Sequence, residues 1–324
     1  MFTHHPTRRA ALGLLGAAAL AAPARAAGWP AERPILAIVP FPAGGGVDVM
    51  TRVLLQHVPR HLPGARFVVE NRAGAAGQLG FEAIFRADPD GYTIGAITTP
   101  AINTIAIERR PQYRLDGFAY LANVVDDPGG LFVRPDSPLR TLADLKAAAL
   151  RDPGALAYGT AGIGSDDHLL GMAFEQAAGV KLSHVPYSGT PPIITDLLGG
   201  RLAVGSLNMG EGLPMLREGR ARALAQGGTA RWSATPDVPT FGEQGVAVTG
   251  GSARGLVAPP GLPQAVREQL SAAIGAALAD PAFLAEAGKL NLPLNPLVGD
   301  SYSRFVMAND AEAQALWQRR PWRE

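Results

Sequence analysis

The sequence predicts an α/β protein of two lobes, each built on a mainly parallel sheet flanked by helices. At 324 residues, 47% of them hydrophobic, the chain exceeds the usual size of one domain and can bury more than one core. Its 39 glycines and 28 prolines indicate many tight turns, which are typical of strands alternating with helices rather than of a helical bundle. Short apolar runs also alternate with amphipathic segments in two successive series, as in parallel α/β units.

Residues 1–26 are expected to be a signal peptide that is cleaved on export to the periplasm. Arg8 and Arg9 precede an uncharged apolar run over residues 10–22, which is shorter than the ~20 residues that a helix needs to cross a bilayer. Alanines then occupy the positions that a signal peptidase reads. The two arginines are typical of a twin-arginine signal, and a general secretion signal is the alternative.

The composition excludes several functions. The chain holds 29 basic and 28 acidic residues, and the first 26 residues hold three arginines but no acid, so the remainder carries a small net negative charge. This balance gives no electrostatic basis for binding nucleic acid. The chain has no cysteine, which excludes disulfides and catalysis by a thiol.

The first series of elements begins with a buried strand and a glycine-rich loop. The branched apolar run over 35–39 is followed by three successive glycines at 44–46. Apolar residues then recur every three or four positions from Val47, which predicts a helix that ends near Pro59. The same pattern repeats in the strands expected over 67–69 and 92–97 and the helix expected over 79–86.

The second series has the same order of strand, loop and helix. Thr141 and Asp144 form the pattern of a capping box, which predicts that a helix begins there. Strands are expected over 131–133, 156–159, 184–187 and 202–207, and helices over 168–178 and 193–198.

The last part of the chain could complete the first lobe. It contains an expected strand over 255–258 and expected helices over 263–278, 281–290 and 302–317. The chain would then cross between the lobes near 122–127 and 246–252, which is the layout of hinge-closing binding proteins. Lobe 1 would comprise residues 27–124 and 248–324, and lobe 2 would comprise residues 125–247.

Two glycine-rich loops are the candidate binding sites. The loop from Phe41 to Asp48 brings backbone N–H groups and a helix N-terminus together, and an anion is expected to approach the backbone closely at Gly45. The loop from Thr160 to Ser165 repeats this arrangement, so two loops on two lobes could hold both ends of one dianion. An ordinary strand-to-helix turn is the alternative for the first loop. The first loop lacks the pattern of a P-loop or a dinucleotide site, so no nucleotide is expected.

Two acids follow the second loop. Asp166 and Asp167 are expected to cap the N-terminus of the next helix, at least one of them without any contact to a ligand. If one of them points into the cleft instead, it would oppose a second carboxylate or favour a ligand that carries an amine.

Enzymatic and metal sites are not expected. Ser165, Asp167 and His168 include the residue types of a catalytic triad, but triads assemble in space, and no Gly-x-Ser-x-Gly motif occurs in the chain. His168 is instead expected to bond the backbone at the start of a helix. His57 and His61 have the spacing of a metal pair but no glutamate between them, so both are expected on a solvated face. The sequence therefore predicts no catalysis and no cofactor, with an exported hydrolase as an alternative.

Six stretches of the chain resemble one family. They are PFPAGGGVDVMTR, VVENRAGAAGQLG, DPDGYTI, YGTAGIGSDDHL, HVPYSGTPPIITDLLGGRL and PDVPTFGEQG. In this order, from residue 34 to 290, the chain resembles the periplasmic substrate-binding proteins of tripartite tricarboxylate transporters, the Bug-type receptors. The resemblance implies a type II periplasmic-binding (Venus flytrap) fold that captures a small carboxylate and delivers it to the membrane subunits of the transporter. A monomer is expected, and a ligand sensor for a signalling kinase is the alternative role.

The resemblance also implies that the ligand is gripped by backbone amides of the two glycine-rich loops. The matching positions are Phe41, Ala43, Gly44, Gly45, Asp48, Thr160, Ala161, Gly162, Gly164, Ser165, His168, Pro186, Tyr187 and Asn208. The chain departs from the family pattern at Pro42, Gly46, Ser188, Ala203 and Leu207. The identity of the ligand therefore cannot be copied from a relative.

Overall fold

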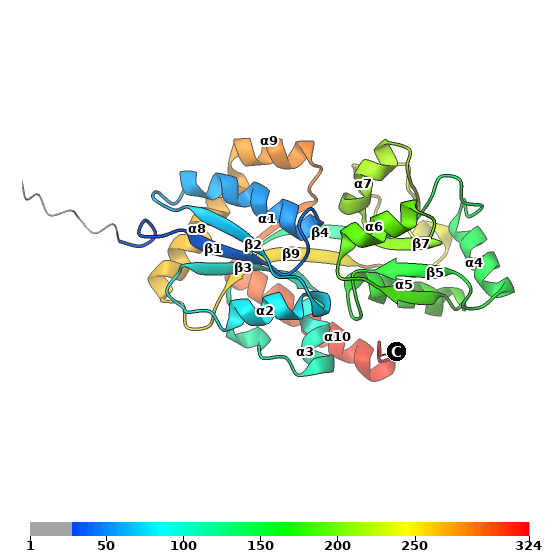
Figure 1. Cartoon of the computed structure of the whole chain (residues 1–324), viewed down its shortest axis with the longest axis horizontal. Coiled ribbons are helices and arrows are strands. Elements are labelled where there is room, and N and C mark those ends of the chain that lie inside the picture. The colour runs from blue at the N-terminus through cyan, green and yellow to red at the C-terminus, as the bar shows by residue number, and fades with distance from the viewer. Residues whose placement is uncertain (1–27, 324) are drawn as a thin grey trace, which may run out of the picture.

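A single long strand joins two sheets in the computed structural model, which describes residues 28–323. Strand β4 (Ala119–Val133) pairs with β9 (Gly251–Ala258) along its first two thirds and with β7 (Val204–Asn208) along its last third. The molecule is an elongated pair of lobes, with β4 and β9 running between them (Figure 1). The predicted signal peptide, with its twin-arginine stretch, lies outside the described residues.

Lobe 1 is built on a sheet in the order β2-β1-β3-β9-β4, and β10 also pairs with β4. Strands β1, β2 and β3 are parallel, whereas β9 and β10 run antiparallel to their neighbours. The strands not yet bounded are β1 (Ile35–Val39), β2 (Phe67–Asn71), β3 (Thr93–Thr99) and β10 (Leu294–Val298). The helices are α1 (Gly46–His57), α2 (Gln78–Phe85), α3 (Ala101–Arg109), α8 (Gln264–Ala279), α9 (Pro281–Lys289) and α10 (Asp300–Arg319).

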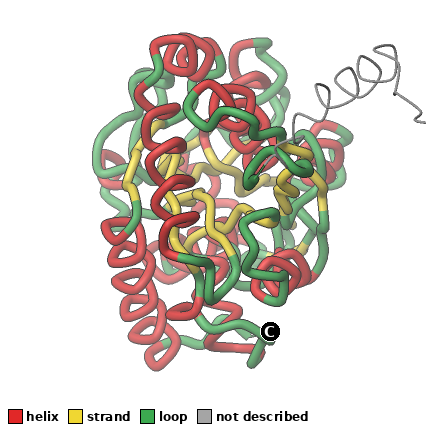
Figure 2. Tube along the Cα trace, turned by 90° about the vertical axis from the view of Figure 1, so that its left-hand side faces the viewer, coloured by secondary structure: helices red, strands yellow, loops and turns green. Residues whose placement is uncertain are grey.

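Both faces of the lobe 1 sheet are covered, because successive side chains of a strand point to opposite faces. Ala37 of β1 belongs to a core with Leu54 of α1 and Ile274 of α8. The next residue, Ile38, belongs to the opposite core with Phe81 of α2. Helices therefore lie on both sides of the strands (Figure 2), and the continuous apolar run of β1 is explained by burial on both faces.

Lobe 2 has the order β4-β7-β5-β6, and β8 also pairs with β4. Its remaining elements are β5 (Ala157–Thr160), β6 (Ser183–Pro186), β8 (Arg222–Gln226), α4 (Leu142–Arg151), α5 (Asp166–Ala178), α6 (Thr190–Leu198) and α7 (Met209–Arg217). Phe174 of α5 packs with Tyr158 on one face of this sheet, and Ile193 of α6 packs with Phe132 on the other. Short 3-10 turns occur at Val58–Arg60, Ala75–Gly77, Leu115–Gly117 and Gly242–Gln244.

The predicted α/β fold of two lobes is confirmed, with the antiparallel pairings gathered around β4 and β9. The predicted capping box also forms, because Thr141 Oγ1 accepts from the Asp144 N–H at 3.1 Å and the Asp144 side chain accepts from the Thr141 N–H at 2.9 Å. The lobe boundaries predicted at 124/125 and 247/248 fall inside β4 and just before β9. Since both of these strands join the lobes, the division of the chain between them stays a prediction.

The expected solvated position of His57 is wrong. Its side chain is buried, and Nε2 lies 2.8 Å from Glu286 Oε2 on α9. The ring also meets Phe283 edge-on, with centroids 5.7 Å apart. Helix α9 covers this face of α1, and the spacing of residues within α1 gave no sign of that neighbour. His61 is exposed, as expected, with Nε2 3.2 Å from Asp280 Oδ2.

The last described residues, 320–323, form a C-terminal tail that crosses from lobe 1 to lobe 2. Arg320 Nη1 donates to the carbonyl of Met172 on α5 at 2.9 Å. Trp322 is fully buried, packs in one cluster with Met172, and donates from Nε1 to Glu108 Oε2 on α3 at 3.0 Å. The tail therefore contacts both lobes at once, and Figure 1 shows it beside α5.

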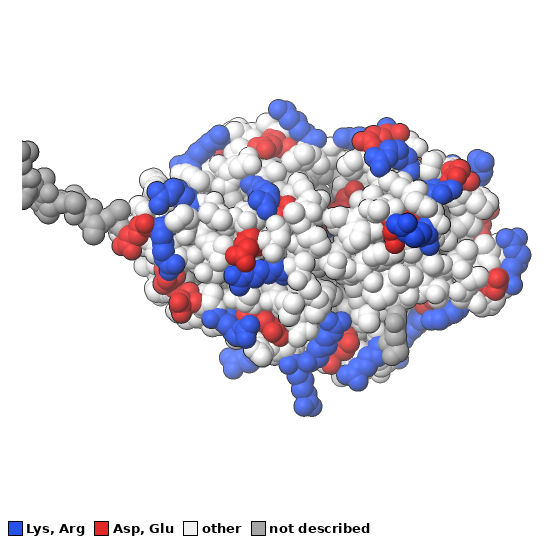
Figure 3. Space-filling view, viewed as in Figure 1, with Lys and Arg blue, Asp and Glu red and all other residues white. Residues whose placement is uncertain are grey.

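Basic and acidic side chains are interspersed over both lobes on the face that Figure 3 shows. This mixed surface agrees with the small net charge. Among residues 28–323, no single helix is long and apolar enough to cross a membrane. Helices α8 and α9 reach that length together, but they meet at an angle of 62°.

Candidate functional site

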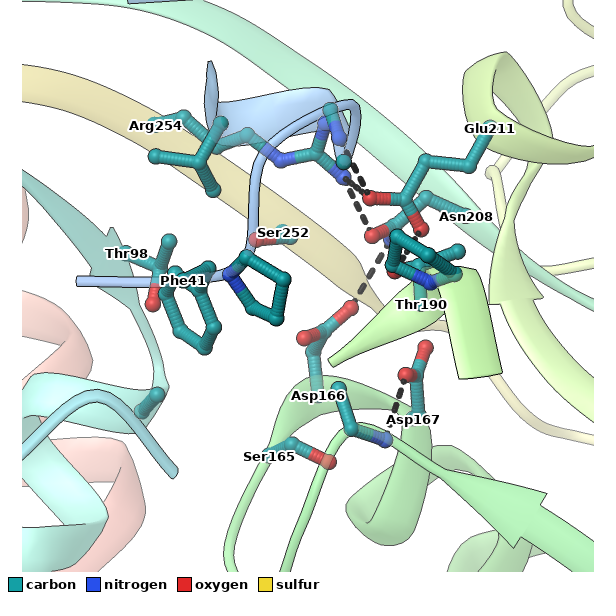
Figure 4. A pocket seen from close by; sticks show the side chains of 17 residues that line it. Phe41, Thr98, Ser165, Asp166, Asp167, Thr190, Asn208, Glu211, Ser252 and Arg254 are labelled. Atoms are coloured by element: carbon teal, nitrogen blue, oxygen red, sulfur yellow. Dashed lines mark hydrogen bonds and ion pairs between the residues drawn. The ribbon is translucent and has the colours of Figure 1, made fainter. Parts of the chain in front are cut away.

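Both lobes contribute to a small cavity at the seam between them. Its volume is about 30 Å³, which is room for about one or two water molecules. Figure 4 shows its walls, which come from β3, the β1–α1 loop and β9 on one side and from the β5–α5 loop, α6, β7 and α7 on the other. It is lined by Phe41, Pro42, Gly45, Gly46, Val47, Thr98, Ala101, Ala161, Ser165, Asp166, Asp167, Thr190, Pro191, Asn208, Glu211, Ser252 and Arg254.

Two helices begin at this cavity, one in each lobe. Helix α1 starts at Gly46 with Gly45 as its N-cap residue, and α5 starts at Asp166 with Ser165 as its N-cap residue. Ser165 Oγ accepts from the His168 N–H at 3.2 Å, which satisfies one amide of the first turn. The positive ends of two helix dipoles therefore face the same space, and this favours a bound anion.

Arg254 of β9 is the centre of the polar contacts across the seam. The guanidinium is buried, and Nη2 donates to Asn208 Oδ1 of β7. The same nitrogen lies 3.2 Å from Glu211 Oε1 and 3.4 Å from Asp127 Oδ2. Two acids, Glu211 and Asp127, therefore balance the charge of Arg254.

Glu211, in the first turn of α7, ties the two lobes together. Its Oε1 accepts from the Gly46 N–H of the first glycine-rich loop at 3.2 Å, and its Oε2 accepts from Thr190 Oγ1 at 2.9 Å. On the other side of the seam, Thr104 Oγ1 of α3 donates to the carbonyl of Gly164 at 2.6 Å. Each glycine-rich loop therefore contacts the opposite lobe, and the structure is in a closed arrangement.

Asp166 and Asp167 both line the cavity, which was the alternative considered for one of them, and neither is the residue that caps α5. Ser165 provides the cap, whereas Asp166 Oδ2 accepts from Asn208 Nδ2 at 2.8 Å and Asp167 Oδ2 accepts from the Ala161 N–H at 3.1 Å. Asp167 Oδ1 is buried and has no hydrogen-bond partner. Burial raises the pKa of Asp166 to about 6, against an opposing effect of Arg254, and it raises the pKa of Asp167 well above its usual range.

Asp127, behind Arg254, is the third acid whose pKa is raised by burial. Its pKa is about 7, although Arg254 and the hydrogen bond from the Gly210 N–H both lower it. That bond is 2.9 Å long and ends on Asp127 Oδ1. Burial therefore raises the pKa values of Asp127 and Asp166 toward neutral pH.

Five of the predicted ligand-binding residues line the cavity, namely Phe41, Gly45, Ala161, Ser165 and Asn208. The other nine do not line it, namely Ala43, Gly44, Asp48, Thr160, Gly162, Gly164, His168, Pro186 and Tyr187. Several of these contact other parts of the protein. The Gly44 N–H donates to Asp48 Oδ2 at 2.9 Å, and Tyr187 OH donates to Asp196 Oδ2 at 2.6 Å. A role for these residues in ligand binding stays a prediction.

His168 bonds the backbone, as expected from its position at the start of a helix. Its Nδ1 accepts from the Gly164 N–H at 3.1 Å, and its ring stacks on His184 with centroids 4.0 Å apart. Burial, followed by the neighbouring His184, lowers the pKa of His168 to about 3. The imidazole is therefore neutral, and it contacts neither the Ser165 hydroxyl nor the Asp167 carboxylate that a triad would require.

The residues that close the cavity were missed by sequence reasoning. Arg254, Glu211, Thr190 and Ser252 lie outside the two glycine-rich loops. One signal was present, because Arg254 interrupts the small and apolar run over 251–258, where a charge in a buried strand needs a partner. Its partners lie on other elements and could not be read from spacing.

Two lobes that close over a cavity, each presenting a helix N-terminus to it, define a hinge-closing solute-binding protein. Residues 50–320 match the family described as "Tripartite tricarboxylate transporter family receptor". The chain belongs to this family, whose members are periplasmic solute-binding proteins rather than enzymes. This confirms the family resemblance predicted from the sequence.

Relatives and solved structures agree with this membership. Protein BugT of Bordetella pertussis is 38% identical over 234 residues, which is 71% of each chain. The structure of periplasmic binding protein BugD is similar at 30% identity and a TM-score of 0.84, over 89% of this chain and 97% of that one.

Two further similar structures hold ligands. MatC from Rhodopseudomonas palustris, with bound malate, is 26% identical with a TM-score of 0.80, over 87% of this chain and 98% of that one. An R. palustris protein with adipate is 28% identical with a TM-score of 0.83, over 90% of this chain and 97% of that one. Among residues 28–323, no group of three His, Cys, Asp or Glu side chains is placed to hold a metal ion.

Proposed function

We propose that the protein captures a small carboxylate between its lobes and delivers it to the membrane subunits of a tripartite tricarboxylate-type transporter. The observation that carries this proposal is the meeting of two helix N-termini, those of α1 and α5, at one cavity walled by both lobes. The malate and adipate held by the two R. palustris proteins support a carboxylate as the class of ligand.

The proposal requires the lobes to open and close. A cavity of about 30 Å³ does not hold a dicarboxylate, so the ligand must enter an open form, and the lobes must close around it less tightly than they do here. Opening separates Glu211 from the Gly46 N–H and Arg254 from Asn208, because the partners in each pair lie on opposite lobes. A ligand that replaces these contacts can bring the two lobes together again.

The location follows from the family and from the predicted leader. The family consists of periplasmic binding proteins, and we propose that this chain is exported by its first 26 residues and acts as a monomer. Mass spectrometry of the exported protein should find an N-terminus near Ala27. An intact Met1 would contradict the cleavage.

A screen of carboxylates against the mature protein tests the ligand class. A ligand at about 100 times its dissociation constant should raise the free energy of unfolding by about 2.7 kcal/mol, which a thermal-shift assay detects. The same ligand should reduce the radius of gyration in solution scattering if the free protein is open. No stabilisation by any carboxylate would contradict the proposed ligand class. Unchanged uptake of the identified ligand in cells that lack this protein would contradict the delivery role.

A further inference from the structure

The charge balance of the cavity does not suit a ligand that is only a dianion. Asp166, Asp167 and Glu211 line the cavity, and Arg254 is the one cationic side chain in its lining. The guanidinium of Arg254 is occupied by Glu211, by Asn208 and by Asp127 behind it. Asp166 and Asp167 therefore face the cavity without a cation of their own.

The buried Oδ1 atom of Asp167 indicates which chemical group a ligand would place beside it. Asp167 is 2% exposed, and its Oδ1 has no hydrogen-bond partner, while Oδ2 is held by the Ala161 N–H. A buried carboxylate oxygen without a donor destabilises the protein, so a bound group that donates a hydrogen bond there would relieve this. Figure 4 shows Asp166 and Asp167 rising from the start of α5 into the space between Phe41 and Thr190.

The opposite wall offers donors of a different kind. Thr98 of β3 and Ser252 of β9 line the cavity beside the N-terminus of α1, and their hydroxyls can donate to a carboxylate. The cavity therefore has an acidic wall at the start of α5 and a wall of neutral donors across from it. A ligand with opposite charges at its two ends matches both walls.

We propose, on the basis of the proposed function, that the ligand carries a positively charged nitrogen in addition to its carboxylate, as an amino acid does. The nitrogen is held between Asp166 and Asp167, and the carboxylate lies toward Thr98, Ser252 and the start of α1. A simple dicarboxylate would instead bring its second negative charge against the two aspartates and would require them to be protonated, whereas an ammonium group pairs with their ionised forms.

The direction of proton exchange on ligand binding gives an independent test of the ligand's charge. The titratable groups that face the pair are Asp127 of β4, Glu211 of α7 and Arg254 of β9, and burial raises the pKa of Asp166 to about 6. A bound cation favours the ionised aspartates, so binding should release protons. A bound dianion favours the protonated aspartates, so binding should take protons up.

The test compares pairs of probes that differ at one group. Aspartate and malate differ by an ammonium in place of a hydroxyl, and 2-aminoadipate and adipate differ by the ammonium alone. Each dicarboxylate of the screen is paired with its amino counterpart in this way. Calorimetry on the mature protein should find that the ammonium member of the better-bound pair binds at least about tenfold more tightly, and buffers of different ionisation enthalpy should show proton release.

Variants assign the preference to the two aspartates. Asp167→Asn should weaken binding of the ammonium probe at least about tenfold and should weaken binding of the matching probe without the ammonium less. Asp166→Asn is the second variant in case the first does not fold. Asp136→Asn is the matched control, because Asp136 is exposed and paired with Arg134 away from the cavity. An ammonium preference that survives both variants would overturn the assignment.

The outcomes separate the inference from the proposed function. Equal or tighter binding of the dicarboxylates would overturn the inference and leave a carboxylate receptor in place. Proton uptake on binding of the ammonium probe would also overturn it. No binding by any member of any pair would contradict the proposed function as well.

Discussion

Gly46 is the position at which a single methyl group should block closure of the lobes. A Cβ at this residue would lie 1.9 Å from Arg254 Nη1 and 2.8 Å from Glu211 Oε1. Both side chains must therefore shift, and the buried Arg254 has little room to do so, while Glu211 also accepts from the Gly46 N–H. Gly46→Ala should therefore separate the lobes at the seam, although alanine is compatible with the first turn of a helix within lobe 1.

The expected size of this effect follows from the contacts that are lost. One charge-assisted hydrogen bond, from Gly46 to Glu211, is worth about 1.5–3 kcal/mol, and the displaced Arg254 loses part of its pairing as well. A penalty of about 2–3 kcal/mol on the closed form would weaken ligand binding by roughly 30- to 150-fold, if binding requires closure. The midpoint of unfolding in denaturant should also fall, because the clash of residue 46 with Arg254 lies within lobe 1, whereas the lost bond to Glu211 lies between the lobes.

Gly288→Ala is the matched control. Gly288 is exposed on α9, away from the cavity, and a Cβ there would meet nothing within 4 Å. Calorimetry with the ligand found in the screen should give an affinity within about threefold of the wild type for this variant. The reasoning would be refuted if Gly46→Ala bound the ligand with an affinity within about threefold of the wild type. It would also be refuted if the ligand reduced the radius of gyration of Gly46→Ala as much as that of the wild type.

Three further changes test other parts of the structure. Trp322→Ala should lower the free energy of unfolding by about 3–5 kcal/mol through lost packing. Because this side chain contacts both lobes, solution scattering of the unliganded variant should also show a larger radius of gyration. An unchanged radius would contradict the bridging role. The raised pKa of Asp127, about 7, means that the folded state binds a proton that the unfolded state releases above about pH 4. The free energy of unfolding of the wild type should therefore fall as pH rises from about 4 to 7 more steeply than that of Asp127→Asn, and equal slopes in denaturant titrations would contradict this. His57→Ala should lower the free energy of unfolding by about 2 kcal/mol or more, whereas His61→Ala should lower it by less than about 0.5 kcal/mol, since of these two histidines only His57 is buried. Similar losses of stability in the two variants would contradict the packing described.

The strands that are buried on both faces could be predicted from the sequence, because each is a short run of branched apolar residues. Strand β1, for example, occupies 35–39 as expected. Strand β4 could not be predicted at its full length of 15 residues. Its middle contains Asp126, Asp127 and Pro128, which are typical of a connection between domains, and only the pairing with β9 shows that the chain stays extended there.

The candidate site was predicted in outline but not in its chemistry. The two glycine-rich loops were found because strand, glycine and helix follow one another in the sequence. The approach of an anion to Gly45 stays a prediction, whereas the close contact of Gly46 with Arg254 could not be predicted, because Arg254 arrives there from a strand more than 200 positions away. Contacts such as those of Arg254 with Glu211 depend on how the lobes meet, and no local pattern encodes that.

The C-terminal tail offers a direct way to watch the lobes move. Arg323 is exposed, and its Nη2 donates to the Glu108 carbonyl of α3 at 3.1 Å, next to the buried Trp322. The chain contains no cysteine, so Arg323→Cys would introduce the single thiol of the protein. A polarity-sensitive dye attached there would sit beside the seam, and its emission would report opening without a second label or a removed disulfide.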